Sequence, residues 1–167
     1  THIEQFGSPR EYANVHQTQG LSIDSSTKQT TPTEWVPGAT PISLVGDFNQ
    51  WDSSRHPLTK NEDGTFSLTI AQDELPHGSL YKLRITGADG QTLDRIPALA
   101  TRVVQDEETK DFSAQVWAPK TEDIYQWKND FSPASVEQLL IYEAHVGIAG
   151  EEQKVHSYQE FTQNVLP

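Results

Sequence analysis

Apolar and polar residues alternate along several short stretches of the chain, and this period of two is typical of half-buried β-strands. In residues 80–85 the two charged side chains, Lys82 and Arg84, share one face of the predicted strand, and apolar side chains share the other. The same alternation occurs in residues 66–70 and 112–117. Turn signals rich in Gly, Pro and Asp separate these stretches. The pattern predicts a mainly-β, antiparallel β-sandwich.

The pattern changes near the C-terminal end. Residues 139–147 are apolar on both faces, which is typical of a strand buried from both sides in a parallel sheet. Ser157-Tyr158-Gln159-Glu160 has the form of a capping box, so a helix is predicted to begin there. Strand, loop and helix in this order are the first half of a βαβ unit.

The remaining segments lack a clear period. Residues 1–30 are polar and predict a leader lying on the domain, with residues 17–31 as a loop or a poor edge strand. Residues 120–138 have the composition of a linker. We therefore expect a leader at 1–30, a sandwich at 31–119, a linker at 120–138, and a separate segment at 139–167.

Residues 44–51, Leu-Val-Gly-Asp-Phe-Asn-Gln-Trp, interrupt a predicted strand with residue types that tolerate unusual backbone angles. The chain is expected to turn sharply there and to bury Phe48 in the core. The pattern leaves open whether Trp51 packs in the core or forms an exposed platform. Trp35, in a strand that ends at Pro37-Gly38, is predicted to be a core residue.

Composition narrows the classes of function. The net charge of −12 argues against binding to nucleic acid or to an anionic membrane, whereas a neutral polysaccharide tolerates it. Neither a signal peptide nor an apolar run near the ~18 residues of a membrane span is visible. The 167 residues suffice for one domain and part of another. The lack of Cys fits a reducing, cytoplasmic compartment, and the lack of Met predicts an excised or processed piece.

Several motifs together carry a family resemblance. Gly46-Asp47-Phe48-Asn49-Gln50-Trp51 resembles the signature of family 48 carbohydrate-binding modules, which are immunoglobulin-like sandwiches in front of glycoside hydrolase family 13 enzymes. Glu34-Trp35-Val36-Pro37 resembles the Glu-Trp-Ala-Pro stretch of that family. Asp94-Arg95-Ile96-Pro97-Ala98 is similar to a stretch of glycogen branching enzymes. Residues 141–147 and 154–167 resemble the start of the (β/α)₈ barrel of 1,4-α-glucan branching enzymes.

The resemblance implies an immunoglobulin-like β-sandwich followed by a truncated barrel of one strand and one helix. It implies a parent enzyme that cleaves α-1,4-glucan and rejoins it in α-1,6 linkage, with carboxylates on later barrel strands. No catalytic residue is therefore expected in this chain. The acidic clusters 106–108 and 151–152 are predicted to be solvated loops, and the scattered His residues predict neither a metal site nor a cofactor.

The resemblance also implies an α-glucan site. Carried over residue by residue, it assigns Trp51 as a stacking platform, with Lys82 and Asn49 as hydrogen-bonding partners. A second aromatic, expected after Asp89-Gly90, falls on Thr92, so binding is predicted to be weak. The partners would be α-glucan and the missing catalytic barrel of the same protein. Two alternatives stay open: a structural or regulatory packing domain without glucan binding, and the same module from a debranching or amylase-type enzyme.

Overall fold

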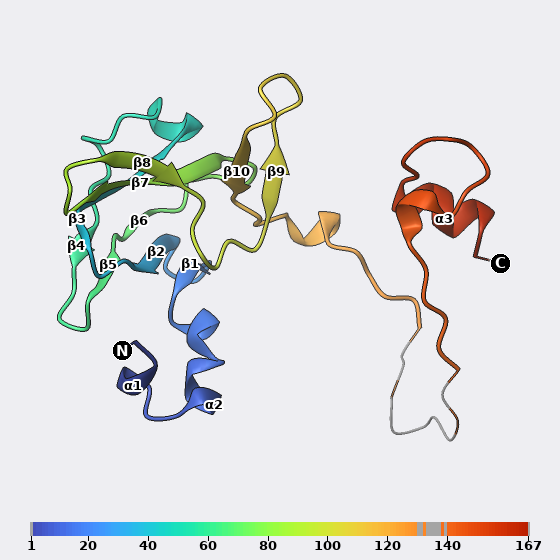
Figure 1. The fold of residues 1–167 in the computed structure, drawn as a ribbon, viewed down its shortest axis with the longest axis horizontal. Coiled ribbons are helices and arrows are strands. Elements are labelled where there is room, and N and C mark those ends of the chain that lie inside the picture. Colours follow the sequence, from blue (N-terminus) through green and yellow to red (C-terminus); the bar gives the residue numbers. More distant parts are fainter. Residues whose placement is uncertain (1, 130–131, 133–137, 139, 167) are drawn as a thin grey trace. The chain divides into compact units, whose positions relative to one another are not determined.

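The computed structural model describes residues 2–129, 132, 138 and 140–166. The chain divides into two compact units, Thr1–Ile124 and Tyr125–Pro167. Both β-sheets belong to the first unit (Figure 1). The second unit contains the α-helix α3, Tyr158–Asn164. No helix among the described residues is both long and apolar enough to span a bilayer.

Two five-stranded antiparallel sheets build the first unit. The first sheet contains β1 (Gly20–Asp24), β2 (Gln29–Trp35), β5 (Thr65–Ser67) and β4 (Thr59–Lys60) in that order, with β6 (Ile70–Ala71) also paired to β2. The second sheet contains β3 (Ala39–Gly46), β7 (Leu80–Gly87), β10 (Phe112–Gln115) and β9 (Val103–Gln105), with β8 (Thr92–Arg95) also paired to β7.

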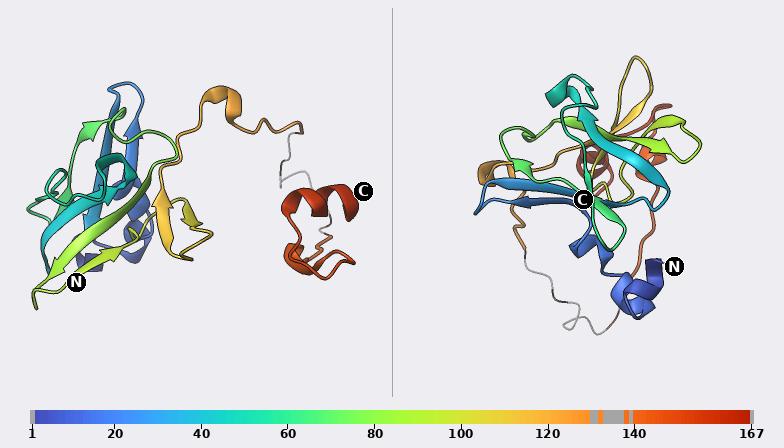
Figure 2. Two further views of the ribbon diagram at one scale, coloured as in Figure 1. Left: turned by 90° about the horizontal axis from the view of Figure 1, so that it is seen from above. Right: turned by 90° about the vertical axis from the view of Figure 1, so that its left-hand side faces the viewer.

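The two sheets form two layers around a shared apolar core (Figure 2). Inward-facing residues of both sheets build it: Ile42, Leu44, Phe66, Ile70, Tyr81, Leu83 and Ala114. Because alternate residues point to opposite faces, Lys82 and Arg84 lie on the outer face of β7. Each fully buried aliphatic side chain contributes about 1.5–3 kcal/mol. The predicted antiparallel sandwich is confirmed.

The alternating stretch at 66–70 is divided into two short strands. β5 pairs with β2 up to Ser67, and β6 resumes the pairing at Ile70. Pro32 of β2 lies between these two pairings, and proline has no N–H to donate to a ladder. Its carbonyl still accepts the Leu68 N–H at 3.2 Å. One proline therefore interrupts a strand that the period alone predicts to be continuous.

The sandwich begins earlier than the sequence suggests. β1 and the first residues of β2 lie inside the 1–30 stretch, and β1 is the edge strand that was one of the two alternatives for residues 17–31. The turn between them is set by Asp24, whose carboxylate accepts the Ser26 N–H at 2.8 Å and the Thr27 N–H at 3.3 Å. A local side-chain turn of this kind closes a hairpin without a strong hydrophobic pattern. The preceding residues form α1 (His2–Gln5), α2 (Pro9–Tyr12) and the 3₁₀ turn Val15–Gln17.

The second unit confirms the predicted helix start. The Ser157 hydroxyl accepts the Glu160 N–H at 3.2 Å, and the Glu160 carboxylate accepts the Ser157 N–H at 2.8 Å. Phe161 is the buried residue of α3.

The prediction of a strand at residues 139–147 is wrong for the residues that the structure describes. Leu139 lies outside the described residues, and residues 140–145 form no strand, with Leu140 and Ile141 91% and 87% exposed. Residues 146–148 form a 3₁₀ turn. A strand needs a neighbour for its backbone groups, and no described strand pairs with this segment.

Candidate functional site

The candidate site is built on the turn that ends β3. Gly46 is required there, because a Cβ at this position would meet the Leu80 carbonyl oxygen and the Phe48 ring. The 3₁₀ turn Asp47–Asn49 follows, and its Asp47 carboxylate accepts the Leu80 N–H at 3.1 Å through each oxygen. The chain therefore leaves β3 but remains attached to the start of β7. Phe48 is partly buried against the core, close to its expected place.

Asn49 stabilises this turn through side-chain hydrogen bonds to the backbone. It is completely buried, and its Oδ1 accepts the Gly46 N–H at 3.0 Å. Its Nδ2 donates to the Leu44 carbonyl at 3.0 Å and lies 2.9 Å from His56 Nδ1. The sequence assigned Asn49 as a glucan contact, and the structure corrects this role. A fully buried amide with internal partners positions the turn rather than touching a ligand.

Trp51 and Lys82 do come together, as the sequence predicted. Trp51 is partly exposed, and Lys82 Nζ lies 6.0 Å from the centre of its ring. This distance is at the outer limit of a cation–π contact. Trp51 therefore belongs to the surface rather than the core, which decides the question that the pattern left open.

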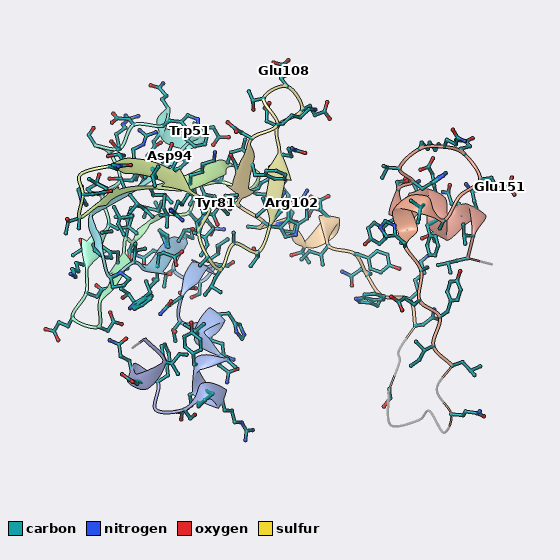
Figure 3. All side chains as sticks on the ribbon, viewed as in Figure 1. Trp51, Tyr81, Asp94, Arg102, Glu108 and Glu151 are labelled. Carbon is teal, nitrogen blue, oxygen red and sulfur yellow. The ribbon has the colours of Figure 1, made fainter. Side chains whose placement is uncertain are left out.

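A cavity of about 370 Å³ surrounds these two residues. β7 supplies the floor through the outward side chains of Leu80, Lys82 and Arg84. The rest of its wall comes from other elements: Trp51, Asp94, Asp106, Thr109, Asp111 and Ser113. Figure 3 shows Trp51 and Asp94 on the same side of the sheet.

The sequence analysis did not predict the ion pair that lies in this cavity. Arg84 Nε and Nη2 donate to the two carboxylate oxygens of Asp94 at 2.8 Å each. A third bond runs from Arg84 Nη1 to the Trp51 carbonyl at 3.1 Å. The Arg84 guanidinium holds the pKa of Asp94 below its ordinary value, and the same bonds raise the pKa of Arg84.

The alternation of residues 80–85 predicts that Arg84 shares a face with Lys82. It does not predict which strand pairs with β7, and so it does not identify the partner of Arg84. Arg84 lies opposite Asp94 in the β7–β8 register, and Leu83 lies opposite Arg95. Asp94 and Arg95 thus face opposite ways, and the ion pair of Asp94 crosses the ladder to Arg84. Register is a tertiary property that a single strand pattern does not reveal.

Thr92 is the residue at which the family resemblance implied a second aromatic. It is exposed on β8, opposite Thr86, and the two hydroxyl oxygens lie 3.0 Å apart. Thr92 is not among the residues that line the cavity. The described residues around the cavity therefore supply one aromatic ring, that of Trp51.

The acidic cluster 106–108 lies in the β9–β10 hairpin. The Asp106 carboxylate accepts the Thr109 N–H at 2.7 Å and the Glu108 N–H at 3.0 Å, and these bonds lower its pKa. The carboxylate thus shapes its own loop, and Asp106, Thr109 and Asp111 reach the cavity. Within the part of the chain that the structure describes, no cluster of His, Asp and Glu could hold a metal ion.

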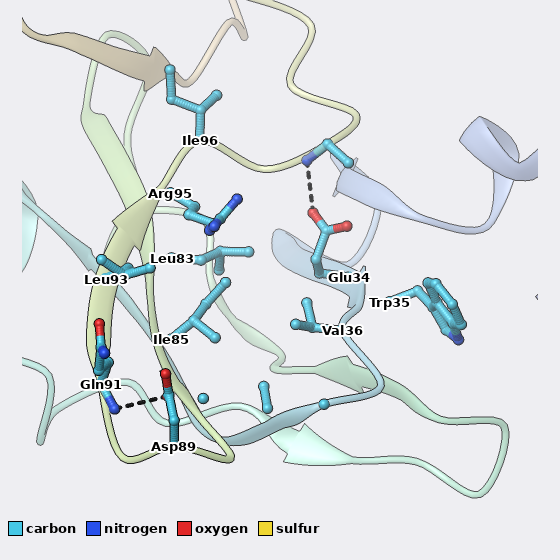
Figure 4. A pocket seen from close by; sticks show the side chains of 14 residues that line it. Glu34, Trp35, Val36, Leu83, Ile85, Asp89, Gln91, Leu93, Arg95 and Ile96 are labelled. Atoms are coloured by element: carbon cyan, nitrogen blue, oxygen red, sulfur yellow. Dashed lines mark hydrogen bonds between the residues drawn. The ribbon is translucent and has the colours of Figure 1, made fainter.

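A second cavity of about 440 Å³ opens between β2 and the β7–β8 hairpin (Figure 4). Val36, Ile85 and Leu93 form its apolar walls. Trp35 points away from it in the close view and is only partly buried, so the predicted core role of Trp35 is corrected. No aromatic ring faces this cavity in that view, so stacking on a sugar favours the Trp51 cavity.

Glu34 is a buried acid at the end of this second cavity. Its side chain is 8% exposed, and its Oε2 accepts the Ala98 N–H at 3.0 Å. Burial raises the pKa of Glu34 above its ordinary value. The bond joins β2 to the segment that follows β8, which closes one end of the sandwich.

The chain resembles known proteins along its whole length. Residues 18–100 match the carbohydrate-binding module 48 family, also described as the isoamylase N-terminal domain. The 1,4-alpha-glucan-branching enzyme of Yarrowia lipolytica is 40% identical over 172 residues, which cover 99% of this chain and 25% of that protein. The enzyme of the same name from Saccharomyces cerevisiae is 37% identical, with 100% and 26% covered. The chain thus spans about a quarter of these curated relatives.

A solved structure shares the fold. Pullulanase type I from Bacillus subtilis, crystallised with maltose, superposes with a TM-score of 0.50 at 19% identity, covering 69% of this chain and 14% of that one. At this level of identity the likeness supports the β-sandwich architecture alone.

Proposed function

Because residues 18–100 belong to the carbohydrate-binding module 48 family, we propose that the first unit is a non-catalytic α-glucan-binding module. The observation that carries the proposal is the partly exposed ring of Trp51 in a cavity that is otherwise lined, apart from Leu80, by polar residues. An aromatic face stacks on the apolar face of a glucose ring, and the surrounding groups of Lys82, Asp94 and Asp111 bond to its hydroxyls.

The affinity is expected to be weak. One exposed indole face covers roughly 60–100 Å², which is on the order of 1.5–2.5 kcal/mol at ~25 cal/mol per Å². A few hydrogen bonds at the surface add about 1 kcal/mol each. The sum is near the roughly 4 kcal/mol of a millimolar complex. The missing ring at Thr92 supports the same estimate.

The parent protein is the second part of the proposal. Relatives named 1,4-alpha-glucan-branching enzyme match almost the whole chain, and this supports a parent that transfers α-1,4-glucan segments to α-1,6 branch points. We propose that the sandwich from β1 to residue 119 serves as the binding module, 120–138 as a linker, and 139–167 as the start of a catalytic barrel. The exposed side chains of Leu140, Ile141 and Tyr142 would then pack against further barrel strands.

Maltoheptaose titration tests glucan binding directly. Wild-type chain should bind with a Kd of about 1 mM, and Trp51→Ala should abolish the signal. Trp127→Ala is the matched control, because Trp127 is 85% exposed in the second unit and outside the cavity. Thr92→Trp should tighten binding about tenfold by adding a second ring.

Three results would each contradict part of the proposal. Unchanged binding by Trp51→Ala would remove the stacking role. Micromolar binding by the wild type would show a second platform, with Trp117, 49% exposed, as the first residue to substitute. No binding by either the wild type or Thr92→Trp would favour the packing alternative, for which the apolar cavity beside Leu93 is the supporting feature.

A further inference from the structure

Trp51 has a backbone conformation that needs outside support. Gln50 and Trp51 both have φ of 60°, so two successive residues with side chains occupy the left-handed region. That region is disfavoured for residues other than Gly. It persists where the surrounding structure fixes the chain on both sides of the peptide.

On one side the turn itself provides the support. The Trp51 N–H donates to the Gly46 carbonyl at 2.8 Å. On the other side the partner is distant in sequence: Arg84 Nη1 donates to the Trp51 carbonyl at 3.1 Å. The carbonyl of the platform residue is thus bonded to the outer face of β7.

Asp94 fixes the orientation of the Arg84 guanidinium. Two parallel bonds of 2.8 Å join the planar guanidinium to the planar carboxylate. Such a fork-to-fork pair leaves few orientations open, which separates arginine from lysine at this position. The third donor, Nη1, is therefore directed to the Trp51 carbonyl by the β7–β8 register.

We propose that Arg84, oriented by Asp94, is the positioning residue of the Trp51 platform. It acts through the backbone of Trp51 and sets where the indole face lies in the cavity. The effect of Arg84 on glucan affinity rests on the proposed function. Its effect on the position of the Trp51 indole does not.

The Arg84–Asp94 pair is too exposed to contribute much to the stability of the sandwich. The Arg84 and Asp94 side chains are 32% and 31% exposed. Ion pairs at this exposure contribute little to the free energy of unfolding. Removing the pair is therefore expected to move Trp51 while leaving the sandwich folded.

Indole N–H resonances in ¹H–¹⁵N spectra of the full chain give the direct test. The chain has four Trp residues, and Trp51→Phe assigns the signal of interest. Arg84→Gln and Arg84→Lys should both shift or broaden the Trp51 signal and leave the other three in place. Arg95→Gln is the matched control, because Arg95 lies on the same strand pair but outside the Trp51 cavity.

An exchange of the two charges separates positioning from simple pairing. Arg84→Asp combined with Asp94→Arg keeps an ion pair across the ladder but leaves no donor at position 84 for the Trp51 carbonyl. The thermal midpoint should match that of the wild type, while the Trp51 signal stays displaced. A return of this signal to its wild-type position would overturn the proposal, as would an unshifted Trp51 signal in Arg84→Gln.

Maltoheptaose titration of the same variants connects the inference to binding. Arg84→Gln and Arg84→Lys should both bind about three- to tenfold more weakly than the wild type, with Arg95→Gln unchanged. Equal affinity of Arg84→Lys and the wild type would contradict the need for the planar fork. If the wild type does not bind while the Trp51 signal still responds to Arg84, the positioning role stands and the proposed function fails.

Discussion

Both units of this chain contain apolar stretches that the sequence predicts to be strands, but only those of the first unit form strands. In the first unit Ile42, Leu44 and Leu83 are buried between two sheets. In the second unit the side chains of Leu140 and Ile141 are exposed to solvent. The difference teaches that an apolar pattern yields a strand only where partner strands supply hydrogen bonds and a second layer. The capping box at Ser157 forms in the second unit because its bonds are local.

Amide hydrogen exchange should reveal the largest difference between the units. Amides of Leu44 and Leu83 should exchange roughly 10³-fold or more slowly than that of Ile141, since core strands open only with global unfolding. Exchange followed by NMR on the monomeric chain measures this. Equal protection of the two regions would break the comparison.

Truncation of one apolar side chain in each unit should give the next largest effect. Leu83→Ala should lower the free energy of unfolding by about 2–5 kcal/mol, because it leaves a cavity in the core. Ile141→Ala, at an exposed position, should change it by less than about 0.5 kcal/mol. Urea denaturation followed by far-UV circular dichroism compares the two, and a comparable loss in both variants would contradict the picture.

Removal of the helix cap should act locally and more weakly. Ser157→Ala should destabilise α3 by about 1 kcal/mol without shifting the urea midpoint of the sandwich. Gln163→Ala, in the same helix but away from the cap, is the control. Carbon chemical shifts of residues 158–164 report the helix population. A shifted midpoint of the sandwich would show that the units are energetically coupled.

The smallest effect concerns Glu34 and has a defined pH dependence. Because its folded-state pKa lies above the ordinary value of 4.5, the folded state binds the proton more tightly than the unfolded state. Its contribution to stability is complete below pH 4.5 and is lost as pH rises through the folded pKa. Glu34→Gln keeps an acceptor for the Ala98 N–H and should therefore be more stable than the wild type at pH 7 but not at pH 4. Thermal unfolding at both pH values tests this, and a pH-independent difference would contradict it.

The sequence predicts most of the fold because the sandwich depends on period-two alternation and on turn residues. The family resemblance assigned Trp51 and Lys82 to one site, and the structure places the two residues close together. The sequence does not predict the Arg84–Asp94 pair, which depends on the β7–β8 register. It misassigns Asn49, because one residue type serves equally as a ligand contact and as the lock of a buried turn.

Trp35 shows the same limit. This aromatic residue at a strand end is directed outward by its place in the sheet. That outcome follows from neighbours that the linear pattern does not contain. Local hydrogen bonds such as those of the Ser157 cap can, by contrast, be predicted from the four consecutive residues 157–160.

β8 and β10 pair with the same edge of β7, at Leu83–Thr86 and at Leu80–Tyr81 respectively. They divide this edge and, in the described ladders, bond to β7 rather than to each other. The cavity beside Trp51 is lined from both strands, by Asp94 of β8 and by Ser113 of β10. The connection from Ile96 to Arg102 links β8 to β9, so substitutions there are expected to change the spacing of β8 and β10 while both remain paired with β7. If the proposed glucan site is correct, this arrangement would let a mutation reshape the cavity without disturbing the sandwich core.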